Sequence, residues 1–138
     1  LTNLGKKTLM KTLPLLFEKK LIGKKQDESK VTYANKFISE DRKINFDNST
    51  DDVFNHIRAH GPKPGSWFIY KGERIKIIKA KKINKSGESS TILNKDFTIA
   101  CKDGAISPLL IQREGKKIVS LDDFLRGFTF VIQDKLNA

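Results

Sequence analysis

Cysteine and long apolar runs are almost missing from this chain, and each shortage excludes a class of protein. Cys101 is the single cysteine, so an intrachain disulfide and a cysteine-based metal site are both excluded, and a reducing compartment is expected. No stretch approaches the roughly 18 consecutive apolar residues of a membrane span. The start Leu-Thr-Asn-Leu lacks the pattern of a secretory signal and is typical of a fragment. We therefore expect a cytoplasmic protein with no membrane association.

Acidic residues are also scarce compared with basic ones. The 138 residues include 27 Lys and Arg against 16 Asp and Glu, which gives a formal net charge of +11. The excess is uneven: residues 1–30 carry eight basic and three acidic residues, residues 31–61 carry four and five, and residues 62–138 carry fifteen and eight. Such asymmetry favours a polyanionic partner, either nucleic acid or an anionic membrane surface. A role in solubility alone stays open at this point.

The N-terminal segment predicts a basic amphipathic helix. It should cover residues 3–22, with a kink or a break at Pro14 and an end at Gly23. The apolar residues at three- and four-residue spacing are Leu9, Met10, Leu13, Leu16, Phe17 and Leu21. A basic helix of this kind can lie on a membrane, but docking on a neighbouring domain is the better interpretation. The polar residues 24–36 that follow indicate a linker.

The rest of the chain predicts a helix followed by short strands. Ser49 is a suitable N-cap and Gly61-Pro62 ends the helix. Ser120 opens a closing helix in the same way. The strands expected between them are 66–70, 73–83, 92–93, 97–101 and 105–112. Strands at this spacing indicate a small antiparallel barrel, so the fold class is mainly β with flanking helices.

The stretch Glu73 to Ile83 carries five cations between apolar residues. The alternation slips by one position between Ile77 and Ile78, which predicts a β-bulge that turns the apolar side inward again. Charges on a strand also deter sheet aggregation, but one or two would serve that purpose. Five of them favour a track for phosphate groups. The five are Arg74, Lys76, Lys79, Lys81 and Lys82.

Catalytic and metal chemistry find little support in the sequence. His56 and His60 lie four residues apart on the predicted helix, a spacing that suits a metal, but no third ligand is evident. Cys101 falls in an alternating strand, so it should be buried and unreactive. The pair Asp122-Asp123 suits the start of a helix. We expect neither a metal nor a catalytic group in this chain.

Several segments, read in order, resemble the C-terminal portion of the methionyl-tRNA formyltransferases. They are LGKKTLMKTLP, QDESKVTYANK, INF, IRAHGPKPGSW, IKIIKA, IACKDGAI, IQREGKK and DFLRG. The most specific are YANK, IRA followed by PKPG, and IQREGKK followed by FLRG. Because the segments occur in the family's order and spacing, the resemblance covers nearly the whole chain.

This resemblance implies a domain organisation and a function. Residues 1–24 would be the last helix of an N-terminal formyltransferase domain, residues 25–35 a linker, and residues 36–138 an OB-like antiparallel Greek-key barrel that binds tRNA. The implied partners are initiator methionyl-tRNA and that N-terminal domain. The parent's co-substrate would be 10-formyltetrahydrofolate, with no cofactor in this chain. The family's catalytic Asn, His and Asp belong to the N-terminal domain, so this chain alone should be inactive.

The resemblance and the charge pattern together give ten candidate tRNA contacts. Lys36 matches the lysine of the family's YAxK segment, and Arg58 belongs to its IRAxxPxPG segment. In that segment Lys63 departs from the family, which usually has an aromatic residue between the two prolines; Phe46 likewise stands where the family commonly has Trp. The full set is Lys36, Arg58, Lys63, Arg74, Lys76, Lys79, Lys81, Lys82, Lys116 and Lys117.

Two other functions remain open on the sequence. The chain could come from a different folate-dependent formyltransferase or hydrolase, whose relatives carry similar C-terminal barrels. It could also be an OB-like module that binds RNA without specificity. The basic surface argues against the first, since such enzymes hold no tRNA. A comparison of how tightly initiator tRNA and other RNAs bind would distinguish the second possibility from a specific tRNA-binding module.

Overall fold

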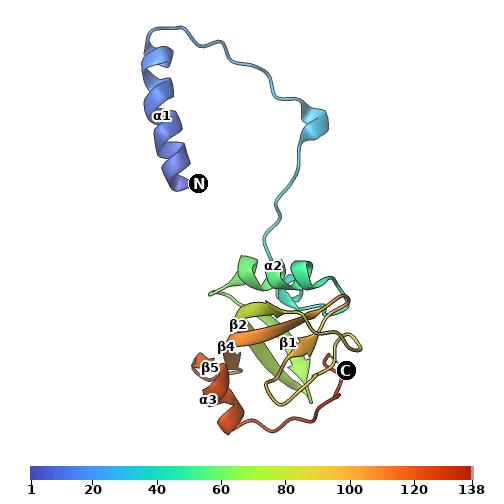
Figure 1. The fold of residues 1–138 in the computed structure, drawn as a ribbon. Coiled ribbons are helices and arrows are strands. Elements are labelled where there is room, and N and C mark those ends of the chain that lie inside the picture. The colour runs from blue at the N-terminus through green and yellow to red at the C-terminus, as the bar shows by residue number, and fades with distance from the viewer. Residues whose placement is uncertain (138) are drawn as a thin grey trace. The chain divides into compact units, whose positions relative to one another are not determined.

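The structure is a computed structural model that describes residues 1–137 (Figure 1). The chain divides into two compact units, Leu1–Asn35 and Lys36–Ala138. In the first unit, α1 covers Thr2–Phe17 and a short 3-10 helix, η1, covers Glu28–Lys30. No helix among the described residues is both long enough and apolar enough to cross a membrane.

Helix α1 is shorter than the apolar pattern predicted. It ends at Phe17 because the chain turns at Lys19, whose φ is 54°. The amides of Lys19 and Lys20 donate to the carbonyls of Leu16 and Leu15, which closes the last turn. The predicted end at Gly23 is therefore wrong. Pro14 lies inside one continuous helix, so the alternative of two abutting helices is wrong as well.

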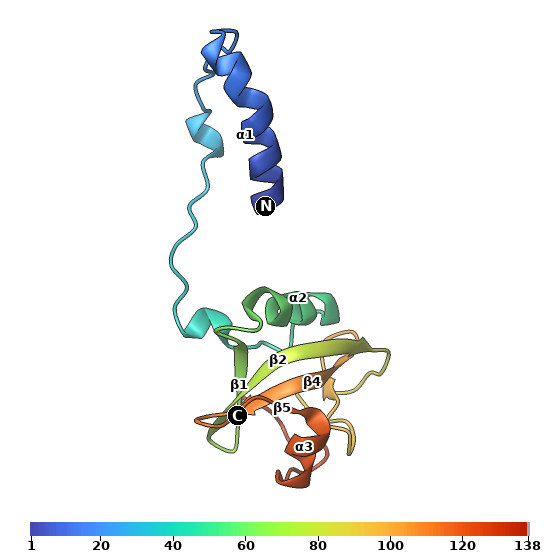
Figure 2. The same ribbon diagram turned by 90° about the vertical axis from the view of Figure 1, so that its left-hand side faces the viewer.

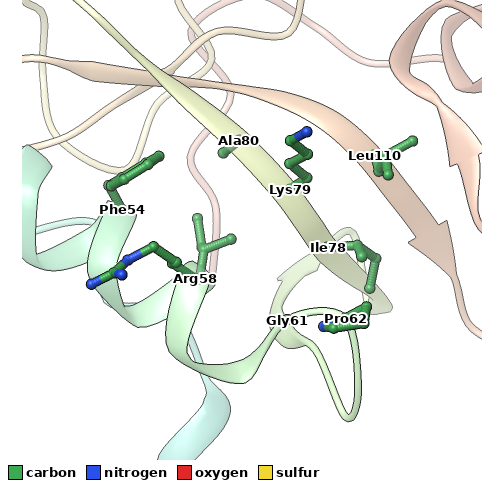
Figure 3. A pocket seen from close by; sticks show the side chains of 9 residues that line it. Phe54, Arg58, Gly61, Pro62, Ile78, Lys79, Ala80 and Leu110 are labelled. Atoms are coloured by element: carbon green, nitrogen blue, oxygen red, sulfur yellow. The ribbon is translucent and has the colours of Figure 1, made fainter. Parts of the chain in front are cut away.

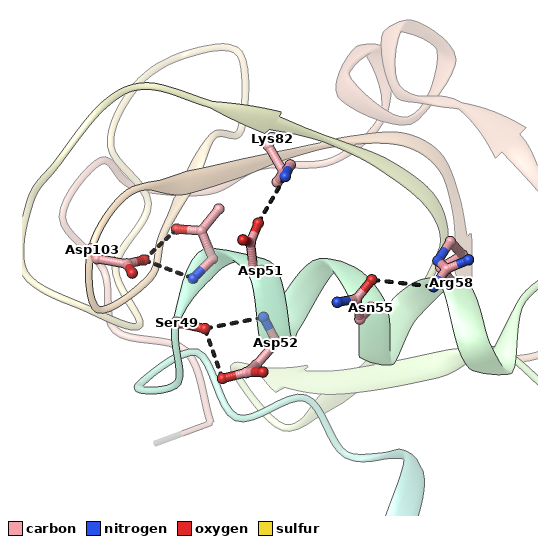
Figure 4. Close-up of polar contacts among 8 residues, drawn as sticks. Ser49, Asp51, Asp52, Asn55, Arg58, Lys82 and Asp103 are labelled. Atoms are coloured by element: carbon pink, nitrogen blue, oxygen red, sulfur yellow. Dashed lines mark hydrogen bonds and ion pairs between the residues drawn. The ribbon is translucent and has the colours of Figure 1, made fainter.

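Helix α2, Thr50–His60, opens the second unit after a 3-10 helix, η2, at Glu40–Arg42. Its start follows the predicted signals: the Ser49 hydroxyl accepts a hydrogen bond from the Asp52 amide at 3.1 Å and donates one to the Asp52 carboxylate at 2.7 Å (Figure 4). Gly61 caps the other end. Val53 and Ile57 are buried, so the predicted helix and its inward face are confirmed.

The second unit is built on an antiparallel sheet. Its strands are β1 (Ser66–Tyr70), β2 (Glu73–Ile83), β3 (Ile99–Ala100), β4 (Ala105–Arg113) and β5 (Val119–Ser120), followed by α3 (Leu121–Arg126). The hydrogen-bonded order is β1-β2-β4-β3, with β5 paired to β4. Helices α2 and α3 lie on opposite sides of this sheet, as Figure 1 and Figure 2 show. The fold class, mainly β with flanking helices, is confirmed.

Two predicted strands are shorter than expected because their backbone groups bond elsewhere. Ile92 makes one bridge to Ile99. Its amide donates to the Asp134 carbonyl and its carbonyl accepts from the Gln133 amide, both in the C-terminal segment. Phe97 adopts a φ of 51°, so β3 begins only at Ile99. Among the described residues, the strand path ends at β1 and β3, and the sheet does not close into a full barrel.

The predicted irregularity in β2 is present. The register with β4 shifts between Ile77 and Lys79 and again between Lys79 and Ala80. Ile75 and Ile77 are fully buried before the shift, and Ala80 is 8% exposed after it. The bulge therefore turns the apolar side back toward the core, as the sequence pattern predicted.

The core of the second unit is aromatic at its centre. The Phe97 ring lies 4.9 Å from Phe130, 5.6 Å from Phe124 and 6.3 Å from Phe68, between ring centroids. Phe46, which stands where the family commonly has Trp, is fully buried against Phe68. This core fixes β2 and β4, and with them the cations on the outer side of the sheet.

Candidate nucleic-acid interface

Trp67 is the centre of a cationic patch on the outer side of β1 and β2. The indole nitrogen donates to the Ser39 carbonyl at 3.0 Å, which fixes the ring. Arg74 Cζ lies 4.2 Å from the ring centroid and Lys43 Nζ lies 5.8 Å from it, both within cation–π range. Lys76 is the direct cross-strand partner of Trp67 and shares its face. Three cations therefore surround one rigid aromatic ring.

A hollow of about 270 Å³ opens beside this ring, and we call it the Trp67 hollow. Its main lining residues are Arg42, Trp67, Arg74, Lys76, Gln112 and Gly115. Arg113 also borders it but holds Glu73 through two hydrogen bonds of 2.7 and 2.9 Å, and that pairing raises the pKa of Arg113. Glu114 contributes one carboxylate to the rim. The balance of charge in the hollow is positive.

The turn between β4 and β5 borders this hollow through Gly115 and carries two predicted cations next to it. Gly115, with a φ of 69°, makes the turn, and the Lys116 amide donates to the Arg113 carbonyl at 3.1 Å. Gln112 Nε2 donates to the Lys116 carbonyl at 2.7 Å. Lys116 and the next residue, Lys117, are exposed on this ordered turn. Backbone amides and ammonium groups can therefore approach a phosphate together.

A second group of cations lies along the edge between α2 and β2. Arg58 and Lys79 line a groove there, and Lys63 is exposed in the turn that joins α2 to β1. The groove adjoins the Trp67 hollow through Gly65: a Cβ added there would lie 2.9 Å from Ile78 Cδ1 and 3.5 Å from Lys76 Cδ. Since Ile78 lines the groove and Lys76 lines the hollow, a side chain of each site approaches the buried Gly65, and the two sites are neighbours.

Lys81 and Lys36 lie apart from these two groups, whereas Lys82 borders the groove, with its Nζ 5.6 Å from the Phe54 ring centroid, and has an acidic partner. Lys81 lines a different hollow, together with Asp96 and Asp122. Lys82 Nζ lies 2.7 Å from Asp51 Oδ1 (Figure 4). Within residues 1–137, it is the only one of the ten candidate cations with an ion pair. Lys36 is exposed at the start of the second unit.

The sequence interpretation missed Trp67, Arg42 and Lys43. Trp67 could have been found, since it alternates with the core residue Phe68 and so points to the other side of β1, where its ring, beside Arg74 and Lys43, is 3% exposed. Lys43 could not have been found from the sequence, because it reaches the Trp67 ring only through a parallel bridge between Lys43 and Trp67. The Ile44 amide donates to the Trp67 carbonyl at 2.7 Å and holds this edge in place.

The two histidines form an edge-to-face pair at the end of α2, with an angle of 61° between their rings. Their ring centroids are 4.6 Å apart, and His60 Nδ1 lies 3.0 Å from the His56 carbonyl oxygen. Burial lowers the pKa of His56, an effect that a hydrogen bond from its imidazole to the Arg42 backbone opposes and the neighbouring His60 reinforces. Within residues 1–137, no cluster of three His, Cys, Asp or Glu side chains is placed to hold a metal.

Cys101 and the Asp122-Asp123 pair have structural roles. Cys101 is 1% exposed, and burial raises its pKa to about 11, so the thiol is neutral at physiological pH. The Asp123 amide donates to the Ser120 hydroxyl at 3.1 Å, and the Asp123 carboxylate pairs with Arg126 at 2.9 Å. These contacts are those of a capped helix start, as the sequence predicted.

Comparison with known proteins assigns the family. The model of the formyl transferase C-terminal domain matches residues 36–129, and the chain belongs to that family. Curated methionyl-tRNA formyltransferases are similar over most of the chain. That of Pelagibacter ubique is 34% identical over 92% of this chain and 41% of its own length, and that of Rickettsia bellii is 34% identical over 97% and 44%. The resemblance seen in the sequence is thereby confirmed.

The chain spans less than half the length of these curated relatives. Among solved structures, HypX from Aquifex aeolicus aligns with a TM-score of 0.58 at 18% identity, covering 88% of this chain and 23% of HypX. A HypX structure in complex with tetrahydrofolic acid aligns with a TM-score of 0.56. At this identity the likeness concerns the fold alone.

Proposed function

We propose that this chain is the C-terminal tRNA-binding module of a methionyl-tRNA formyltransferase that acts in the cytoplasm, at the start of protein synthesis. The observation that carries the proposal is the Trp67 hollow. Arg74 and Lys43 contact one fixed indole, Lys76 stands beside it, and the Gly115–Lys117 turn adds further cations.

Recognition by such a surface would depend mainly on shape and charge. An A-form RNA helix hides its base edges in a deep, narrow groove, so proteins contact its phosphates and 2′-hydroxyls instead. Lys76, Lys116 and Lys117 would hold the backbone of initiator methionyl-tRNA. The aminoacylated end of the tRNA would then reach an active site on the N-terminal formyltransferase domain, where 10-formyltetrahydrofolate supplies the formyl group.

Residues 1–24 are proposed to be the last helix of that N-terminal domain, and residues 25–35 its linker to the barrel domain. Helix α1 has no buried residue, and large apolar side chains such as Leu9, Met10 and Phe17 are exposed on it. An apolar stripe of this size indicates a protein partner. Addition of the N-terminal domain should protect the α1 amides from hydrogen exchange, and unchanged exchange would contradict the assignment.

The salt dependence of tRNA binding tests the electrostatic part of the proposal. If the surface neutralises about five phosphates, the logarithm of the affinity should fall against the logarithm of salt concentration with a slope magnitude of roughly 3.5 to 4.5. Titration of the full chain with initiator tRNA at several salt concentrations measures this slope. A slope near zero would contradict the proposal that these cations bind phosphate groups.

Charge reversal locates the surface. Lys76→Glu and Lys117→Glu should each weaken tRNA binding by about tenfold or more, because each replaces a phosphate contact with a repulsion. Lys95→Glu is the matched control for Lys117→Glu, since both lysines are exposed and Lys95 lines neither the Trp67 hollow nor the groove beside α2. Equal losses from all three variants would mean that only net charge matters.

Competition separates a tRNA module from a general RNA-binding module. Initiator tRNA, elongator tRNA and a plain RNA duplex should compete in that order if the surface fits a folded tRNA. Equal competition by all three would favour a non-specific module, and failure of all three would favour a formyltransferase acting on a different amine.

A further inference from the structure

The groove between α2 and β2 has an apolar floor that the phosphate track does not use. It measures about 360 Å³, within the roughly 300–1,000 Å³ of small-ligand pockets. Phe54 enters it from α2, Ile78 and Ala80 from β2, and Leu110 from β4 (Figure 3). Leu110 is 36% exposed and Phe54 is half-buried. The groove is therefore open to solvent at Phe54 and Leu110, while Ile57 and Ala80 at its base belong to the core.

Cations border this apolar floor. Arg58 and Lys79 both line the groove (Figure 3), and Lys82 Nζ lies 5.6 Å from the Phe54 ring centroid. None of the described residues that line the groove is acidic. Arg58 is held by a 3.3 Å hydrogen bond to Asn55 Oδ1, which leaves its other guanidinium nitrogens available (Figure 4). The groove is thus complementary to a ligand with a flat apolar part and a negative charge.

A nucleotide has this combination, with an aromatic base joined to a phosphate. The groove adjoins the Trp67 hollow through Gly65, so an RNA held by phosphates at the hollow passes directly beside it. A paired base cannot enter, since the duplex covers its faces, but an unpaired base can stack on an aromatic side chain. An acidic peptide would satisfy the charge but would not explain the continuity with the phosphate track.

We propose that the groove between α2 and β2 is a subsite for one unpaired nucleobase, with Phe54 as its stacking surface and Arg58 and Lys79 as contacts to the adjoining phosphate. This inference rests on the proposed RNA-binding function and adds a requirement to it. The surface should distinguish RNA with an extrahelical base from fully paired RNA of the same charge.

The test uses the full chain with two probes, a short RNA duplex and the same duplex with one bulged adenosine. Base–aromatic stacking predicts that the bulged duplex binds about 5- to 150-fold more tightly at fixed salt. Phe54→Ala should reduce this preference to about one while leaving affinity for the plain duplex unchanged, and Phe54→Tyr should retain it. Leu110→Glu changes an exposed position on the other side of the groove and leaves Phe54 in place. It should also abolish the preference for the bulged duplex.

The outcomes separate this inference from the function on which it rests. If neither duplex binds, the RNA-binding proposal itself is wrong. If both duplexes bind equally and Phe54→Ala changes nothing, the phosphate track stands and the base subsite is wrong. If an acidic peptide containing an aromatic residue binds the wild type but not Phe54→Ala, and the bulge gives no preference, the groove is a peptide site and the inference is overturned.

Discussion

Helices α1 and α2 have similar amphipathic patterns and very different structural settings. Helix α2 has a Ser49 cap, Asp51 and Asp52 in its first turn, and buried Val53 and Ile57. Helix α1 has no side-chain cap, no acidic residue in its first turn and no buried residue. The spacing of apolar residues therefore shows only that a helix has an apolar side. The Ser49 cap and the first-turn acids show that the ends of α2 are also encoded by residues next to them in the sequence.

The difference also separates two functions for an apolar stripe. In α2 the stripe stabilises the sheet that carries the cationic surface. In α1 it is exposed and available to a partner domain. Most helical stability in proteins comes from the packing of the apolar face, so α1, which has no buried residue, should be less stable than α2. Each of the following predictions tests that contrast.

The largest effect should come from shortening a buried side chain. Ile57→Ala should lower the free energy of unfolding of the second unit by about 2–5 kcal/mol, because Ile57 is 1% exposed in the core. Leu9→Ala, at a residue 56% exposed on α1, should change it by less than about 0.5 kcal/mol. Urea unfolding followed by circular dichroism measures both. Comparable losses would show that α1 packs on the second unit.

Loss of the α2 cap should have an intermediate effect. Ser49→Ala removes the acceptor of the Asp52 amide and should cost about 0.5–2 kcal/mol of unfolding free energy. Ser49→Gly should cost only a few tenths of a kcal/mol, since glycine leaves the amide open to water. The same unfolding titration compares them. If the two variants were equally stable, the cap would not specify α2.

The histidine pair should make α2 sensitive to acid. Burial lowers the pKa of His56 from 6.5, so the unfolded chain takes up a proton at a higher pH than the folded chain. Stability is therefore complete above pH 6.5 and should fall as pH decreases from that value toward the lower folded pKa. His56→Gln should flatten this dependence in unfolding titrations between neutral pH and about pH 5. If the pH dependence of stability were the same in His56→Gln as in the wild type, groups other than His56 would cause it.

The exposed ion pair at the start of α2 should have the smallest effect on stability. The side chains of Asp51 and Lys82 are 72% and 52% exposed, so Asp51→Asn should cost less than about 1 kcal/mol. The same variant releases Lys82 and removes a negative charge, so affinity for RNA should rise at low salt. Measurement of both quantities on one variant separates the two roles, and an unchanged affinity would show that RNA does not approach this edge.

The sequence predicts best where the determining residues are neighbours along the chain. The Ser49 cap, the strands at 66–70 and 73–83 and the bulge after Ile77 were all predicted, since each depends on adjacent residues. The strand expected at Ile92 was not formed as predicted, because its partners Gln133 and Asp134 lie some forty positions away and bear no recognisable strand pattern.

The same limit applies to the candidate interface. The cations of β2 and the Gly115 turn were predicted from composition and spacing, and the structure brings Arg74, Lys76 and that turn to one hollow. The pairing of Lys82 with Asp51 joins residues 31 positions apart, and the Lys43 contact with Trp67 depends on a bridge across the sheet edge. A pattern of charges shows which cations exist, and only the fold shows which have partners.

Trp67 gives the molecule an optical reporter of its own. It is the chain's only tryptophan, and Arg74 Cζ lies 4.2 Å from the centroid of its ring. A phosphate that draws the guanidinium away alters the electric field at the indole, on which its ultraviolet emission depends. Occupancy of the hollow should therefore change the intrinsic fluorescence of the unlabelled protein, so that ligand binding can be followed in real time.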